Sequence, residues 1–343
     1  MTQAAARSWP LTPLQLGMLH ESLLSERTSV NLEQVACHLD DEAFDPTAMK
    51  RAWEALTQRH EVLRSVYAWR DDRAPSQDVA TDAPLEWAVH DLRALSPVQQ
   101  QEALDAWRAA DRQRGVLLDV TPNWRLTWFR WEDRRSTLYW TFHHIMLDGA
   151  SIASLLQEAL QAYSALLQGL PPESAPLSEL SFADYCVALQ ALRHQPQAQE
   201  AAQRFFEAHL HGVSADQPLE ALGRPPQPMA EDMGAGMGSV RASLASTDME
   251  QLQALARASD ATLGTVVQVA WGVLLSRMSG QRDVVFGVVR AGRHIVPGAQ
   301  NTVGCLINTL PVRVKVEMGV SIEQLLRDMR RYMLGMRPHE HLF

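Results

Sequence analysis

Two segments rich in aromatic and β-branched residues, Trp124–Trp131 and Thr137–Phe142, run directly into the heptapeptide HHIMLDG at His143–Gly149. A short polar run separates the two segments, which predicts a β-hairpin. The Asp-Gly pair that ends the heptapeptide predicts a turn into a helix from about Ser151 to Leu167. The sequence therefore places a cluster of polar side chains at a rigid junction between a strand and a helix, where they can face a cleft.

Adjacent residues of a strand point to opposite faces, so only one of His143 and His144 can face a given site. We expect His144, which is nearer the turn, to face the open side, and His143 to be packed or hydrogen-bonded inside. An imidazole with a pKa of about 6.5 is partly neutral at pH 7, so His144 can accept a proton there. Asp148 is expected to cap the following helix or to pair with an arginine, and Gly149 to supply a backbone position that a Cβ would not allow.

Other interpretations of the heptapeptide are open. In the plainest one the histidines end a strand for packing and Asp148 is only a helix cap. A metal site made of His143, His144 and Asp148 is disfavoured, because opposed histidines cannot both reach one ion without a bulge. A serine-hydrolase triad is disfavoured because no GxSxG is present. Without a nucleotide-binding glycine motif either, we expect neither a metal nor a tightly bound cofactor.

Composition narrows the class of protein. The chain has 40 acidic and 31 basic residues and a net charge of −9. An acidic balance without a basic block argues against nucleic acid or an anionic membrane as the main partner. Three widely spaced cysteines are typical of reduced thiols. The N-terminus has no apolar signal region, and the most apolar stretch, Leu263–Leu275, is too short to span a bilayer. We therefore expect a cytoplasmic protein that works with small substrates and protein partners.

A length of 343 residues suggests two folding units at about 150 residues each. Nine of the ten tryptophans lie between Trp9 and Trp140, and a Gly- and Pro-rich linker runs from Gly169 to Pro176, so we expect units 1–170 and 171–343. Helices and strands alternate, which predicts an α/β or α+β fold. Further helices are expected at Pro13–Leu24 (capped by Thr12), from Pro46 through Leu56, and at Pro97–Arg114, Phe182–Leu192, Pro196–Leu210, Asp248–Ala258, Thr262–Met278 and Ile322–Leu334. Further strands are expected at Val30–Leu39, Leu63–Trp69, Leu85–Val89, Ser239–Leu244, Asp283–Val289 and Leu306–Val316, with a loop at Gln217–Gly238.

The heptapeptide resembles the HHxxxDG motif of the condensation domains of nonribosomal peptide synthetases, and four further segments resemble motifs of that family in the expected order. They are LTPLQLGML (11–19), RHEVLRSVY (59–67), FADYCVALQ (182–190) and VGCLINTLPVR (303–313). HHxxxDG alone is shared with related acyltransferases and with epimerization domains, whereas the ordered set indicates the condensation family. The RHE at 59–61 favours condensation over epimerization, and the histidines disfavour a heterocyclization domain, which carries aspartates there.

The resemblance implies a chloramphenicol-acetyltransferase-like fold of two similar lobes, with the active site at their interface. Two peptidyl carrier proteins, one upstream and one downstream, would deliver thioesters on phosphopantetheine arms, and the acceptor amine would attack the donor thioester to form an amide. An adenylation domain is implied in the same assembly line, as in the biosynthesis of peptide antibiotics and other secondary metabolites.

The resemblance also implies a role for each residue of the site. His144 would orient the amine and accept its proton. Asp148 would be structural and pair with an arginine from the other lobe, Arg293 rather than Arg290. Asn308 would lie beside the tunnel, and Ser151 on the substrate side.

The chain ends at RPHEHLF, near the sixth motif of the family, so we expect an incomplete second lobe, either in a fragment of a longer synthetase or in a degenerate domain. Two alternative functions stay open. One is a free-standing acyltransferase of the same superfamily that makes esters or amides, and the other is a non-catalytic relative that docks proteins. The intact His144, Asp148 and Gly149 argue against the second alternative.

Overall fold

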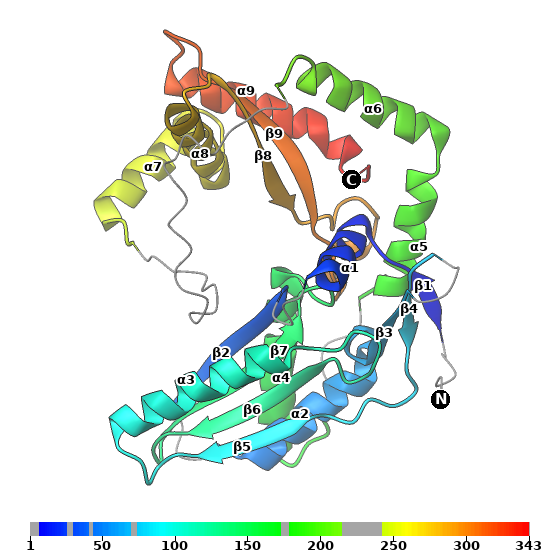
Figure 1. Ribbon diagram of the computed structural model, residues 1–343, viewed down its shortest axis with the longest axis vertical. Helices are drawn as coiled ribbons and strands as arrows, with labels where there is room; N and C mark the ends of the chain where they lie inside the picture. The colour runs from blue at the N-terminus through cyan, green and yellow to red at the C-terminus, as the bar shows by residue number, and fades with distance from the viewer. Residues whose placement is uncertain are drawn as a thin grey trace. The chain divides into compact units, whose positions relative to one another are not determined.

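The computed structural model describes residues 7–25, 30–40, 44–69, 74–172, 178–214 and 242–342 (Figure 1). The chain divides into two compact units. The first contains the described residues up to His194 together with Ala291–Asn308, and the second contains Gln195–Arg290 and Thr309–Leu342. This division differs from the predicted linear boundary at residues 170 and 171. The difference arises because Phe182, Tyr185 and Leu306 join the hydrophobic core of the first unit.

The main sheet of the first unit has four strands in the order β2-β7-β6-β5. Their bounds are Leu32–Asp40 (β2), Trp87–Asp91 (β5), Trp124–Arg130 (β6) and Arg135–His143 (β7). Strands β6 and β7 pair antiparallel from Trp124 opposite Phe142 to Arg130 opposite Ser136, which confirms the predicted hairpin. Strand β2 is antiparallel to β7, and β5 is parallel to β6.

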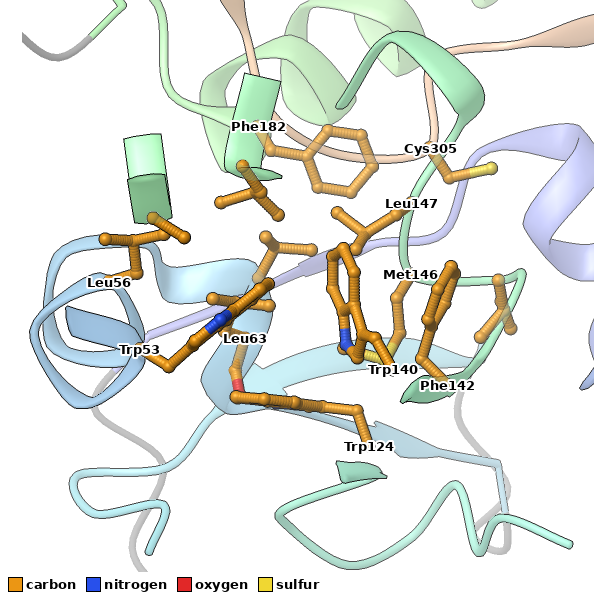
Figure 2. Packing of buried hydrophobic residues seen from close by; sticks show 14 of the residues in the cluster. Trp53, Leu56, Leu63, Trp124, Trp140, Phe142, Met146, Leu147, Phe182 and Cys305 are labelled. Atoms are coloured by element: carbon orange, nitrogen blue, oxygen red, sulfur yellow. The ribbon is translucent and has the colours of Figure 1, made fainter. Parts of the chain in front are cut away.

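Both faces of this sheet are covered, which explains why its central strands are buried along almost their whole length. On one face lie α2 (Pro46–Arg59) and α4 (Gly149–Leu167), and on the other lies α3 (Pro97–Arg114) (Figure 1). The face toward α2 and α4 carries a tryptophan cluster, in which the ring centroids of Trp53 and Trp140 are 4.7 Å apart (Figure 2). Around it gather Leu56, Leu63, Trp124, Phe142, Met146, Leu147, Phe182 and Cys305. The heptapeptide thus follows a strand whose side chains pack in the apolar core.

Side-chain caps fix the helix ends close to where the sequence predicts them. Helix α1 (Pro13–Leu24) begins with a capping box between Thr12 and Gln15, and α3 begins with a box between Ser96 and Gln99. Asp45 caps α2, Asp148 caps α4, and Ser181 caps α5 (Phe182–Arg193). Each cap satisfies backbone N–H groups that have no partner inside the helix, so the boundary is encoded locally.

A second, three-stranded sheet in the first unit was not predicted in full. Its order is β1-β4-β3, with β1 at Ser8–Pro10, β3 at Ser65–Ala68 and β4 at Ser76–Val79. Strands β1 and β4 have only three and four residues, so they are too short to show an apolar alternation. The first residues of the predicted strand Leu63–Trp69 belong instead to a 3₁₀ turn, η1 (Glu61–Arg64).

The second unit has its own apolar core, which includes Val312, Leu326 and Met336. Its elements are α6 (Pro196–Leu210), α7 (Ser246–Ala258), α8 (Leu263–Ser279), β8 (Asp283–Arg290), β9 (Asn308–Lys315) and α9 (Ile322–Met336), and β8 pairs with β9. The predicted loop at Gln217–Gly238 lies outside the described residues. So does the first half of the predicted strand Ser239–Leu244, and residues 242–244 are neither helix nor strand, which corrects that prediction.

In the part of the chain that the structure describes, no single helix is long and apolar enough to cross a bilayer. Helices α7 and α8 reach that length and composition only together, and they are bent by 99° relative to each other.

Candidate active site

The heptapeptide forms the connection between the central strand β7 and helix α4. Strand β7 ends at His143, a tight turn follows in which the N–H of Met146 donates to the carbonyl of His143 at 3.1 Å, and Asp148 caps α4. The side chains of Ile145, Met146 and Leu147 are completely buried. The turn is therefore anchored by the apolar core, and the polar residues on either side of it are held in place.

His143 faces inward and is 3% exposed. Its Nδ1 accepts a hydrogen bond from the N–H of Ile145 at 3.1 Å, so the proton of the neutral ring sits on Nε2. Nε2 lies 2.9 Å from Oγ of Ser22, and that hydroxyl donates to the carbonyl of Met18 at 2.8 Å. Burial, and to a smaller extent His144, lowers the pKa of His143 to about 4. His143 is therefore a neutral, internally bonded histidine.

His144 is partly exposed, as the alternation of strand side chains predicts. Its backbone N–H donates to the carbonyl of Asn31 at 2.8 Å, and its Nδ1 lies 2.9 Å from the carbonyl of Leu147. A carbonyl oxygen can only accept, so Nδ1 carries the proton and Nε2 carries the lone pair. Within the described residues Nε2 has no hydrogen-bond partner. The two adjacent imidazoles thus have opposite tautomers, and that of His144 can receive a proton.

Asp148 performs both of the functions predicted for it. Its Oδ1 accepts from the N–H of Ser151 at 2.9 Å, and its two oxygens accept from Arg293 Nη1 and Nη2 at 2.7 and 2.8 Å. The N–H of Leu306 adds a bond of 3.0 Å. Arg293 makes this pair, whereas Arg290 pairs with Glu340. Arg293 belongs to the same compact unit as Asp148, which corrects the expectation of an arginine from another unit, because residues 291–308 return to the first core.

Ser151, expected on the substrate side, is completely buried. Its hydroxyl donates to the carbonyl of Gly304 at 2.8 Å and accepts from the N–H of Gly304 at 3.0 Å and from Arg293 Nη2 at 2.9 Å. The Ser151 hydroxyl thus makes all its hydrogen bonds inside the protein, and these bonds link α4 to the segment that follows Thr302. Asn308, expected beside a tunnel, is buried at the start of β9.

Gly149 differs from the sequence expectation. It is exposed, a Cβ built on it meets no atom within 4 Å, and its φ is not positive. The prediction that a Cβ would not fit at Gly149 is therefore wrong. A side chain is excluded instead at Gly304, where a Cβ would lie 2.2 Å from the ring of Phe182, and at Gly292, where it would lie 1.9 Å from the carbonyl oxygen of Leu306.

The RHE residues border a cavity of about 520 Å³ between α2, α4 and the start of α5. There Glu158 lies 2.9 Å from Nε2 of His60 and 3.3 Å from Nε of Arg59. His144 is not among the residues that line this cavity. The described residues contain no group of three or more His, Cys, Asp or Glu side chains placed to hold a metal ion.

Sequence reasoning missed the residues that support the heptapeptide from a distance. Asn31 adopts a left-handed conformation with φ of 56° and offers its carbonyl to His144, and Gln15 and Ser22 of α1 hold the turn and His143. Gln15 is recognisable in the sequence only as the third residue of a capping box. Nothing in the sequence shows that its amide also reaches residue 145.

Comparison with known proteins shows the family of the chain. The chain matches the condensation domain family over residues 5–342 and belongs to that family. It is 35% identical over 334 residues to one of the linear gramicidin synthase proteins of Brevibacillus parabrevis, covering 97% of this chain and 4% of the relative. It is 33% identical over 300 residues to chondramide synthase of Chondromyces crocatus, covering 87% of this chain and 7% of the relative. The chain thus spans a small part of the synthetases it matches.

Solved structures show the same fold. The first condensation domain of the calcium-dependent antibiotic synthetase, solved in complex with a substrate analogue, aligns with a TM-score of 0.80 at 21% identity, covering 98% of this chain and 76% of that chain. The starter condensation domain of rhizomide synthetase aligns with a TM-score of 0.75 at 19% identity, covering 98% of this chain and 74% of that chain. The predicted chloramphenicol-acetyltransferase-like α/β fold of a condensation domain is confirmed. The individual roles of His144, Asn308 and the other site residues stay predictions.

Proposed function

We propose that the chain catalyses amide bond formation between a donor thioester and the amine of an acceptor, both carried on peptidyl carrier proteins, in nonribosomal peptide synthesis. The observation that carries the proposal is the geometry of His144. Its Nδ1–H is committed to the Leu147 carbonyl, and its Nε2 is an available acceptor on a partly exposed ring at the end of a buried strand. Membership of the condensation domain family supports the reaction class.

In the proposed step the acceptor nitrogen attacks the thioester carbonyl carbon, a C–N bond forms, and the C–S bond breaks. His144 Nε2 takes the proton that the nitrogen loses and then gives it to the departing phosphopantetheine thiolate, which leaves as a thiol while the ring returns to its neutral form. The Leu147 carbonyl stabilises the positive charge that the ring gains in between, since Nδ1–H already points at it. The products are an amide and a free thiol, so atoms and charge balance.

A single base suffices because the thioester is already activated. Alignment of two tethered groups contributes about 7–11 kcal/mol in favourable cases. A positioned general base contributes roughly 10²–10⁴-fold in rate. The first contribution requires a rigid site, which the buried turn and the Asp148–Arg293 pair provide.

The partners follow from the reaction. We propose an upstream and a downstream peptidyl carrier protein, an adenylation domain in the same assembly line, and phosphopantetheine arms as the substrate carriers, in the cytoplasm. The matches to synthetases such as linear gramicidin synthase and chondramide synthase support this setting.

The test is a single-turnover assay with loaded donor and acceptor carrier proteins, with the carrier-bound product measured by mass spectrometry. His144→Ala is expected to slow amide formation by about 10²–10⁴-fold. His194→Ala, which alters an exposed histidine at the end of α5, is the matched control and is expected to keep the wild-type rate. Wild-type turnover by His144→Ala would contradict the role of this imidazole. Product formation from acyl-CoA but not from carrier-bound donors would instead indicate a free-standing acyltransferase.

A further inference from the structure

In the turn between His143 and Asp148, the backbone carbonyl of Ile145 is bonded to buried polar side chains. The carbonyl of Ile145 accepts from Nε2 of Gln15 at 2.8 Å and, at 3.4 Å, from the hydroxyl of Tyr67. The side chain of Ile145 is completely buried, so this carbonyl cannot turn to bulk water. A buried carbonyl without a hydrogen-bond partner is unfavourable, so its orientation depends on these donors.

Hydrogen bonds with Thr12, Ile145 and Gln77 hold the side chain of Gln15 in place. Its Oε1 accepts from the N–H of Thr12 at 3.0 Å, which fixes the other amide atom as the donor Nε2. Nε2 donates both to the Ile145 carbonyl and to Oε1 of Gln77 at 2.9 Å. Gln77 in turn donates to Oγ of Ser65 at 3.1 Å. Gln15 and Gln77 are both 0% exposed, so the network has one arrangement in which the amides are satisfied.

The Ile145 carbonyl belongs to the same turn as the carbonyl that orients the active ring. Two residues further on, the Leu147 carbonyl receives Nδ1–H of His144 and sets both the ring orientation and the tautomer. A rotated Ile145 peptide would move the following peptides, because the short turn is bounded by β7 on one side and by the cap of α4 on the other. Gln15 therefore influences the orientation of the His144 ring indirectly, through the two peptide units between the Ile145 and Leu147 carbonyls.

We infer that Gln15 is a positioning residue of the proposed condensation reaction: it holds the Ile145 carbonyl and so keeps the His144 ring in the orientation and tautomer that leave Nε2 unprotonated. The inference rests on the proposed function for its kinetic consequence. Its structural consequence, the tautomer of His144, is independent of any activity.

The test compares Gln15→Met with Gln77→Met in the full chain. Each variant replaces a completely buried amide of the same network by an apolar side chain of similar length, but only the first removes the donor to Ile145. With loaded carrier proteins, Gln15→Met is expected to lower kcat by about tenfold to a hundredfold, since small misplacements of a reacting group cost that much. Gln77→Met is expected to stay within about threefold of wild type, with KM little changed in both variants.

A spectroscopic measurement separates positioning from a general loss of structure. In ¹⁵N-histidine-labelled protein, with the His144 signals identified from His144→Ala, wild type is expected to show a protonated Nδ1, and Gln77→Met the same. Gln15→Met is expected to show exchange between the two tautomers. Gln15→Asn keeps an amide but is one methylene too short to bridge Thr12 and Ile145, so it is expected to show the same exchange. It allows the tautomer of His144 to be measured should Gln15→Met not fold.

The inference is overturned if the folded Gln15 variants keep the protonated Nδ1 of His144, or turn over as fast as Gln77→Met. A wild-type chain that forms no amide, yet shows the expected tautomers, would instead contradict the proposed function and leave the positioning by Gln15 supported.

Discussion

The two ends of the turn between β7 and α4 are held by different chemistry. At the end of β7, His143 is bonded to neutral groups, namely the hydroxyl of Ser22 and the N–H of Ile145. At the start of α4, Asp148 is bonded to the guanidinium of Arg293 through two bonds. Both ends are buried, but only the second places a full charge inside the protein. The charged end is expected to be the more sensitive to the loss of one partner, since an unpaired buried charge costs more than an unpaired neutral group.

The largest effect is expected from Arg293→Met, which leaves the buried Asp148 carboxylate without its counter-ion. The free energy of unfolding of the first unit should fall by about 3–5 kcal/mol. Urea unfolding followed by tryptophan fluorescence reports on this unit, because nine of the ten tryptophans lie between residues 9 and 140. Arg93→Ala, which removes an exposed pair with Asp91, is the control and should change the midpoint little. Equal midpoints for the two variants would show that the charged end is no stronger than a surface pair.

The neutral end, at His143, should make the stability of the protein depend on pH. The pKa of His143 in the folded protein is about 4, below the value of about 6.5 for an unperturbed histidine, so the unfolded chain binds a proton first as the pH falls. The contribution is fully present above about pH 6.5 and is lost as the pH falls toward 4, by about 3 kcal/mol over that interval. The free energy of unfolding of wild type and of His143→Gln, measured at pH 7, 5.5 and 4.5, separates the contribution of His143 from that of the carboxylates. Parallel pH profiles of the two proteins would argue that His143 is not held neutral by the fold.

Removing the hydroxyl of Ser22 should have a smaller effect. Ser22→Ala leaves Nε2–H of His143 without its acceptor, and the free energy of unfolding is expected to fall by about 1–2 kcal/mol. Added salt should not alter this loss, because no charged group is involved. Chemical unfolding at low and high ionic strength measures both points. A loss as large as that of Arg293→Met would remove the distinction between the two ends.

The smallest effect is expected at Gly149, which lies at the charged end. A Cβ added there would meet no atom within 4 Å. Gly149→Ala should change the free energy of unfolding by no more than about 0.5 kcal/mol. Thermal and urea unfolding check this. A loss of several times that amount would show that the backbone here needs a conformation that only glycine adopts.

Local signals made much of the fold predictable. Thr12 and Pro13 predict the start of α1, Pro97 that of α3, and the aromatic and β-branched residues on either side of a polar run predict the β6–β7 hairpin, since each signal depends on neighbours in the sequence. Strands β1 and β4 were missed because they are short and form a sheet only by pairing with partners that are distant in the sequence.

The candidate site was predictable in its chemistry and less so in its surroundings. The alternation of strand side chains placed His143 inside and His144 outside, and family resemblance pointed to Arg293. The burial of Ser151 and the return of residues 291–308 to the first unit could not be read from the sequence, because they depend on contacts across about 150 residues, such as those between Ser151 and Gly304.

The pair between Asp148 and Arg293 joins residues that are 145 positions apart, with most of the second unit between them. At about 5–20 residues per second, a ribosome needs on the order of ten seconds to supply the arginine after the aspartate has emerged. For that time the nascent first unit carries an acidic group that its interior cannot neutralise. Completion of this unit therefore has to wait for translation of the intervening segment, and a pause or break in synthesis before codon 293 would leave the amino-terminal part unfinished.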